Sequence, residues 1–247
     1  MNLDLTGKRA LVTGASKGIG AETARVLAAE GCDVTIVSRT IGELEKTAKE
    51  IAAATSRTIV ACAADLSRSS EIARVAEQFG DIDILVNNAG AIPGGRLEDI
   101  DENTWRVAWD LKVFGYINLT REIFGRMSAR GSGTIVNVIG AAAQIRDPSY
   151  ICGVVGNAAL TAFTMSLGSD SHRVGVRVVG VSPGPVATER LRELQESVAS
   201  STARPFGRAA DTAEIAAAVA FLASPKSGYT SGTVLMVDGG LSARAAA

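Results

Sequence analysis

Three glycines in the segment "TGASKGIG", residues 13–20, have a spacing that suits phosphate binding. Gly14, Gly18 and Gly20 give the pattern Gly-x-x-x-Gly-x-Gly where an apolar strand pattern changes into a helical one. Residues without side chains let backbone N–H groups approach a pyrophosphate, and the start of a helix adds partial positive charge. A glycine-rich turn alone is a weak signal, but at the first strand–helix junction of an alternating chain it predicts a dinucleotide-binding site.

The rest of the chain alternates short strand patterns with longer helical ones. Most strand patterns are continuous apolar runs, as expected for strands buried on both faces of a parallel sheet. The predicted strands are residues 9–13, 33–38, 58–63, 82–87, 134–139, 176–181 and 234–237. The predicted helices are residues 19–30, 41–54, 70–79, 103–130, 151–169 and 212–223. This alternation predicts an α/β, Rossmann-type doubly wound fold with a parallel sheet, in one domain over residues 1–247.

The composition argues against several classes of function. The net charge of −1 favours neither a nucleic-acid nor a membrane-surface partner, and we predict no apolar run of membrane-spanning length. Cys32, Cys62 and Cys152 lie in largely apolar surroundings, which favours packed, reduced thiols. The single histidine, His172, lies in a polar stretch and is predicted at the surface. We therefore predict a cytoplasmic protein without a bound metal.

Residues 190–208 interrupt the regular alternation. The segment reads "RLRELQESVASSTARPFGR" and is polar, with a short helical piece and a proline. After a late strand, such a segment lies at the carboxyl edge of the sheet, where it is placed to act as a lid over a bound substrate. From composition alone, a plain surface connection is an equally good interpretation.

Five motifs resemble the short-chain dehydrogenase/reductase family in their order and spacing. They are "TGASKGIG", "ADL" at residues 64–66, "NNAG" at 87–90, "VSPGPVAT" at 181–188 and "SGTVLMVDGG" at 231–240. The resemblance covers essentially the whole chain. It implies a single domain with a seven-stranded parallel sheet, a nicotinamide cofactor, a small-molecule alcohol or carbonyl substrate, and a homodimer or homotetramer.

The resemblance also assigns cofactor-binding residues. It places Asp65 and Leu66 near the adenine, and it places Thr188 near the carboxamide of the nicotinamide. The whole predicted set is Gly14, Ser16, Lys17, Gly18, Ile19, Gly20, Arg39, Asp65, Leu66, Asn88, Ala89, Gly90, Pro183, Gly184, Val186 and Thr188. Some of these residues have a simpler interpretation, because Asn88 can cap a strand end and Gly184 can form a turn.

The end of the second predicted strand indicates which cofactor is preferred. A fold that prefers NAD carries a carboxylate there, which accepts hydrogen bonds from the ribose hydroxyls. This chain has Ser38 at that position, followed by Arg39, and Lys17 lies in the glycine turn. Two cations without a carboxylate favour a 2′-phosphate, so we predict NADP (NADPH) in preference to NAD.

The family's catalytic residues are missing from the positions that the resemblance assigns. Family members place a Tyr and a Lys one helical turn apart, with a Ser after the preceding strand and an Asn on the middle helix. The segment "NAAL" resembles the family's "KAAL", which puts Asn157 at the Lys position and Gly153 at the Tyr position. Counting along the chain puts Gly140 at the Ser position and Asp110 at the Asn position.

Three interpretations stay open. In the first, the chain is a dehydrogenase whose acid has moved to Tyr150, with Asp110 and Asn157 bonding around it. In the second, Asp110 is a buried base in non-redox chemistry. In the third, the chain binds NADP(H) without catalysis, as a sensor or a partner subunit. A simpler role for Tyr150 is packing, which is common for an aromatic residue before a helix.

Further expectations concern space and charge around these positions. The missing side chain at Gly153 predicts a wider pocket beside the nicotinamide. Lys112 is two residues from Asp110, so on an α-helix it points away from Asp110 and is predicted to be solvated. An Asp110 buried near Asn157 is expected to form a hydrogen bond with it. The core or a subunit interface is predicted to hold Trp105, Trp109, Phe114 and Tyr116.

Overall fold

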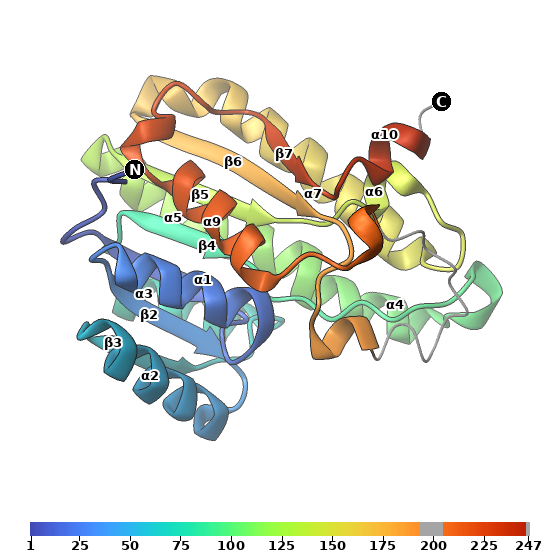
Figure 1. Cartoon of the computed structure of the whole chain (residues 1–247), viewed down its shortest axis with the longest axis horizontal. Helices are drawn as coiled ribbons and strands as arrows, with labels where there is room; N and C mark the ends of the chain where they lie inside the picture. Colours follow the sequence, from blue (N-terminus) through green and yellow to red (C-terminus); the bar gives the residue numbers. More distant parts are fainter. Residues whose placement is uncertain (193–204, 246–247) are drawn as a thin grey trace.

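Seven parallel strands form one sheet in the order β3-β2-β1-β4-β5-β6-β7 (Figure 1). The computed structural model describes residues 1–192 and 205–245. The strands are β1 Arg9–Thr13, β2 Asp33–Ser38, β3 Ile59–Ala63, β4 Ile84–Asn87, β5 Gly133–Val138, β6 Val176–Pro183 and β7 Val234–Val237. Each predicted strand is present, with its ends shifted by at most two residues. The predicted Rossmann-type fold is confirmed.

The order of the strands reverses in the middle of the sheet. Strands β1 to β3 run outward on one side, and β4 to β7 run outward on the other. At the reversal, β1 pairs with β4 in parallel, with Leu11 opposite Leu85. Parallel strands have all their carboxyl ends at one edge, and the crevice beside the reversal is where folds of this kind bind ligands.

Helices cover both faces of the sheet (Figure 1). The core on one face joins the strands to α1, α2 and α9, and the core on the other face joins them to α3, α5 and the end of α7. These helices are α1 Gly18–Ala29, α2 Ile41–Thr55, α3 Ser69–Phe79, α5 Gly115–Arg130, α7 Ile151–Asp170 and α9 Thr212–Ala223. Strands sandwiched in this way are apolar on both sides, which explains their continuous apolar runs.

The predicted middle helix is divided by a π-helical turn. It consists of α4 Glu102–Trp109, the π-turn Asp110–Phe114 and then α5. A π-turn spaces its hydrogen bonds five residues apart and therefore rotates the side chains that follow, relative to a continuous α-helix. Periodicity does not reveal such a turn, because the apolar pattern continues on either side of it.

Two short helices and one segment differ from the sequence-based expectations. Helices α6 Ala142–Ile145 and α10 Leu241–Ala245 were not predicted. The predicted lid, residues 190–208, lies mostly outside the described residues, since residues 193–204 are not described.

Helix α7 contradicts the prediction that no apolar run is long enough to span a membrane. With the turn that follows it, the stretch Ile151–Val174 is long and apolar enough to cross a membrane by length and composition. In the fold, α7 packs against β6, α6 and the π-turn. A core helix passes the same test of length and composition, because burial within a protein selects the same apolar residues.

The thiols and the histidine lie where they were predicted. Cys32, Cys62 and Cys152 are buried and unpaired, and His172 is exposed. Burial raises the pKa of Cys32 to about 12, so this thiol stays protonated at neutral pH. Over residues 1–192 and 205–245, no group of three His, Cys, Asp or Glu side chains is arranged to hold a metal ion.

Candidate active site

The glycine-rich turn lies at the carboxyl end of β1, beside the reversal of strand order. Gly14 has a φ of +63°, and a side chain on Gly20 would begin 2.3 Å from the Gly14 carbonyl oxygen. Both positions therefore require glycine. Helix α1 begins at Gly18, and its N-cap residue Lys17 makes no side-chain capping bond. The first N–H groups of an α-helix have no acceptor within the helix, so this helix start suits the pyrophosphate of a dinucleotide.

Asn88 and Ala89 brace this turn from the end of β4. The Thr13 hydroxyl accepts hydrogen bonds from the backbone N–H groups of Asn88 (2.9 Å) and Ala89 (3.0 Å). The Asn88 amide donates to the carbonyl oxygens of Thr13 (3.0 Å) and Gly14 (3.1 Å). The fold thus brings the predicted residues Gly14, Asn88 and Ala89 together, and it uses the Asn88 amide to hold the turn.

The ends of β2 and β3 form the other half of the predicted cofactor site. The Ser67 hydroxyl donates to the Asp65 carboxylate at 2.7 Å, and this bond is the main reason that the pKa of Asp65 lies below its usual value. Arg39, exposed at the end of β2, contributes to the same lowering. The Ser38 hydroxyl is buried there and has no hydrogen-bond partner in the described part of the chain.

The segment after β6 reaches the start of α1. A side chain on Gly18 would begin 3.5 Å from Cγ2 of Thr188, and Lys17 forms an ion pair with Glu189. The predicted residue Thr188 is thus brought to the glycine turn. Because Lys17 is already paired with a carboxylate, Arg39 is the better candidate for binding a ribose phosphate.

The ring of Tyr150 covers Gly153 at the start of α7. A side chain on Gly153 would begin 2.0 Å from Cε1 and 2.2 Å from Cζ of Tyr150. The ring fills the volume that the glycine leaves, so the predicted widening of the pocket at this position is wrong. The reason is that residues three apart at a helix start lie on the same side.

Tyr150 lies between an apolar cluster and a cation. Its ring packs against a cluster that includes Ile92, Ile100 and Trp105. Burial raises the pKa of the Tyr150 phenol, and the nearby Arg190 guanidinium partly opposes that rise. At neutral pH the phenol is therefore protonated and able to donate a proton.

Asp110 and Lys112 have the opposite environments to those predicted. Asp110 is exposed, so it fits neither a buried base nor a hydrogen-bond partner of Asn157. Lys112 is 8% exposed and points into the protein. The physical reason is that residues two apart on a helix point in different directions, so with Asp110 in solvent the Lys112 side chain faces the protein. Of the predicted aromatic core residues, Tyr116 is buried, whereas Phe114 is half exposed.

Asn157 faces the loop after β5. It is 4% exposed, and its Oδ1 atom has no hydrogen-bond partner within the described residues. A side chain on Gly140 would begin 2.8 Å from the Nδ2 atom of Asn157. The fold therefore brings Gly140 and Asn157 together and leaves a buried acceptor without a partner beside them.

We expect Gly140→Ser to destabilise the protein. Gly140 has a φ of +140°, a conformation that residues with a side chain rarely adopt, and the new Cβ would crowd Asn157. The expected loss in free energy of unfolding is about 1–3 kcal/mol, measured by urea denaturation. Gly125→Ser, on the exposed face of α5 with open space around it, is the matched control and should change little. Equal stability of the two variants would contradict this prediction.

A cavity of about 330 Å³ lies between the loop after β4, helix α4 and Arg190. It shares Arg190 with the surroundings of the phenol, and Ala108 belongs both to its wall and to the apolar cluster around Tyr150. The full lining is Ala91, Pro93, Asn103, Thr104, Val107, Ala108 and Arg190. Its position makes it a candidate for the substrate site.

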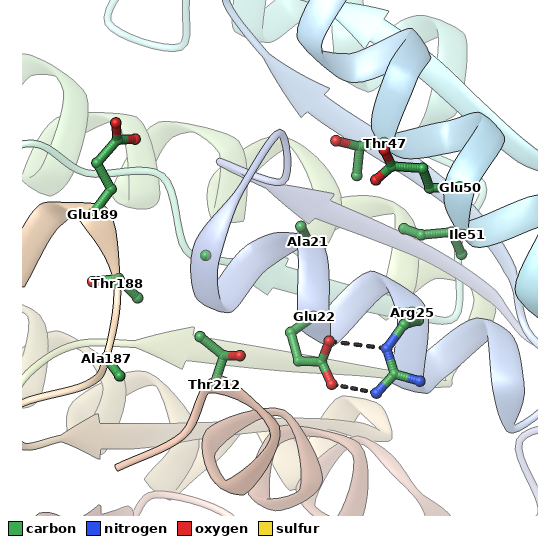
Figure 2. Close-up of a pocket in the computed structure, with 11 residues that line it drawn as sticks. Ala21, Glu22, Arg25, Thr47, Glu50, Ile51, Ala187, Thr188, Glu189 and Thr212 are labelled. Atoms are coloured by element: carbon green, nitrogen blue, oxygen red, sulfur yellow. Dashed lines mark hydrogen bonds and ion pairs between the residues drawn. The ribbon is translucent and has the colours of Figure 1, made fainter. Parts of the chain in front are cut away.

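A second cleft, of about 440 Å³, lies between α1, α2 and residues 187–189. Figure 2 shows the ion pair between Glu22 and Arg25 within it, with Glu50 on one side and Glu189 on the other. Each of these carboxylates is paired with a cation: Glu22 with Arg25, Glu50 with Lys46 and Glu189 with Lys17. The remaining lining residues are Gly18, Ala21, Thr47, Ile51, Ala187, Thr188 and Thr212.

Comparisons with known proteins agree with this fold and site. A family profile described as enoyl-(acyl carrier protein) reductase matches residues 14–242. A galactitol 2-dehydrogenase (L-tagatose-forming) of Cereibacter sphaeroides is 37% identical over 245 residues, which are 96% of this chain and 95% of that protein. A solved short-chain dehydrogenase/reductase family protein is 38% identical, with a TM-score of 0.90 over 98% of this chain and 100% of its own.

A third similar protein was solved with ligands. The L-sorbose reductase of Gluconobacter frateurii, complexed with NADPH and L-sorbose, is 27% identical, with a TM-score of 0.88 over 98% of each chain. The chain belongs to the short-chain dehydrogenase/reductase family, whose members are oxidoreductases.

Proposed function

We propose that this chain is an NADP(H)-dependent oxidoreductase that interconverts a small alcohol and its carbonyl compound, with Tyr150 as the acid. The observation that carries the proposal is the Tyr150 ring seated over Gly153. It puts a phenol in the volume of position 153, where the resemblance places the catalytic tyrosine. On this proposal, Tyr150 from the preceding turn takes the role of the usual tyrosine.

The chemistry divides between the cofactor and Tyr150. When bound at the glycine turn, NADPH would supply the hydride for reduction of the carbonyl carbon. The Tyr150 phenol donates its proton to the carbonyl oxygen, and in oxidation the phenolate takes that proton back. Arg190 beside the phenol stabilises the phenolate form, because it opposes the rise in the pKa of Tyr150.

The supported substrate class is a polyhydroxylated alcohol or its ketone. Two similar proteins have names that give galactitol and L-sorbose as substrates. In the cavity between the loop after β4, helix α4 and Arg190, the side chains of Asn103, Thr104 and Arg190 offer donors and acceptors to hydroxyl groups.

Arg39 supports the preference for NADP(H) and gives a direct test of it. Arg39→Ala should weaken NADPH binding about tenfold or more and leave NADH binding nearly unchanged, because only NADPH has a 2′-phosphate to pair with a guanidinium. Fluorescence titration of both cofactors measures the two dissociation constants. Arg173→Ala, at an exposed arginine after α7, is the control. An equal loss of affinity for both cofactors would contradict the predicted role.

The function itself is tested on the purified wild type. Saturable NADPH binding, followed by turnover of galactitol or L-tagatose or L-sorbose with NADP⁺ or NADPH, is the expected result. Binding without turnover on a broad panel of polyols and ketoses would favour a cofactor-binding protein without catalysis. The absence of saturable binding would contradict both of these functions.

A further inference from the structure

Lys112 is a buried cation at the carboxyl end of β5. Its Nζ donates to the carbonyl oxygens of Val138 (2.9 Å) and Ile139 (3.1 Å) and to the hydroxyl of Tyr116 (3.1 Å). The Tyr116 hydroxyl in turn donates to the Val138 carbonyl at 3.0 Å. The ammonium group therefore ties the middle helix to the end of this strand.

No negative charge balances this ammonium group within the described residues. Its partners are two carbonyl groups and a phenol whose pKa burial raises well above the usual value, so the phenol stays neutral. Burial lowers the pKa of Lys112 to about 7. A buried charge without a counter-charge is costly, and here that cost falls at the ligand-binding edge of the sheet. An anionic ligand would offset it.

The stem of Lys112 runs along the segment after β4. A side chain on Gly90 would begin 2.5 Å from Cδ of Lys112, so the glycine leaves the room that the stem occupies. Gly90 ends the "NNAG" motif, whose Asn88 braces the glycine turn. Lys112 thus lies between the ends of β4 and β5, in the half of the sheet opposite the β2 end with Arg39.

Asn157 lies against the same loop after β5 that Lys112 contacts, and its side chain is uncharged. Lys112 binds the carbonyl of Ile139, and the next residue, Gly140, lies against the Asn157 amide. Asn157 keeps a buried, unpaired Oδ1 atom there. The loop after β5 therefore contacts the ammonium group of Lys112 at Ile139 and the neutral amide of Asn157 at the next residue, Gly140.

We propose that Lys112 is the positioning cation of this active site. From the π-turn it fixes the end of β5, and it supplies the positive charge that favours the reduced dinucleotide there. The nicotinamide ring carries a positive charge in NADP⁺ and none in NADPH, so a fixed ammonium group near it weakens NADP⁺ binding relative to NADPH. This inference rests on the proposed function, because it assumes that the dinucleotide binds at this edge.

The test removes the positive charge at position 112 and then introduces one at position 157. Lys112→Gln keeps amide donors for the strand carbonyls and removes the charge, and the double variant Lys112→Gln/Asn157→Lys returns an ammonium group from α7. Dissociation constants for NADPH and NADP⁺ are measured by titration at a pH below the lowered pKa of Lys112, where its amine is charged, and folding is checked by thermal unfolding. Lys46→Gln, on an exposed lysine of α2, is the control.

Lys112→Gln should reduce the preference for NADPH over NADP⁺ by about tenfold, and the double variant should restore most of it. The proposal would be overturned by a folded Lys112→Gln protein with the wild-type preference, or by a loss that Asn157→Lys leaves uncorrected. If Lys112→Gln does not fold, a folded double variant with the wild-type preference supports the proposal, and two unfolded variants show that Lys112 is purely structural. Failure of wild-type NADPH binding would instead contradict the proposed function itself.

Discussion

Tyr150→Phe should lower kcat by about 10²–10⁴-fold, the usual contribution of a positioned acid or base, and leave NADPH binding unchanged. The substitution keeps the ring that packs over Gly153 and removes only the hydroxyl. Steady-state kinetics in both directions, together with NADPH titration, measure the two effects separately. Tyr229→Phe is the matched control, because Tyr229 is fully exposed.

The pH dependence of wild-type turnover is a second test of the role of Tyr150. Burial raises the pKa of Tyr150 above its ordinary value of about 10, so the phenol is protonated throughout the neutral range. Carbonyl reduction uses the protonated form, so the Tyr150 contribution should be constant through neutral pH and fall only above the raised pKa. Alcohol oxidation uses the phenolate and should rise with pH below that value. Tyr150→Phe turnover at the wild-type rate would exclude Tyr150 as the acid.

Gly153→Ala should abolish most of the turnover although it leaves the Tyr150 hydroxyl group chemically intact. The new Cβ would lie 2.0 Å from Cε1 of Tyr150, so the ring must leave its seat. Helix propensity favours alanine over glycine by about 1 kcal/mol, so a loss of activity cannot come from a weaker helix. The expected decrease in kcat is close to that of Tyr150→Phe, measured on protein whose unfolding temperature is recorded in parallel.

Gly156→Ala is the matched control for this substitution. It makes the same change on the same helix, but its Cβ would come no closer than 3.4 Å to a neighbouring atom. The double variant Gly153→Ala/Tyr150→Phe should be no slower than Tyr150→Phe alone, since both changes act through one phenol. Additive losses in the double variant would show that Gly153 matters for another reason.

Much of the fold and the cofactor end of the site followed from local patterns. The β1–α1 turn was predictable because Gly14 and Gly20 are required by contacts that lie within a few residues or at the end of the neighbouring strand. The cofactor preference could be predicted from the end of β2 for a similar reason, since Ser38 and Arg39 occupy consecutive positions at one strand end. Such features depend on strand order, which the alternating pattern already implies.

The reaction end was less predictable, because it depends on side-chain direction. Helical spacing predicted that Lys112 and Asp110 point apart, but it did not show which of the two faces the protein, and the structure buries Lys112 and exposes Asp110. Nor does the sequence show that the Tyr150 ring folds back over Gly153, since that depends on the backbone path before α7.

By itself, the sequence determined the seven-stranded sheet, the glycine turn that suits a dinucleotide, and the absence of Tyr and Lys side chains at positions 153 and 157. Only the tertiary structure decided which residues take the places beside them: Tyr150 over Gly153, and Lys112 beside the loop that holds Gly140. The physical reason is that apolar periodicity and glycine spacing are local and repeat along the chain. The direction of one buried side chain depends on contacts between distant segments.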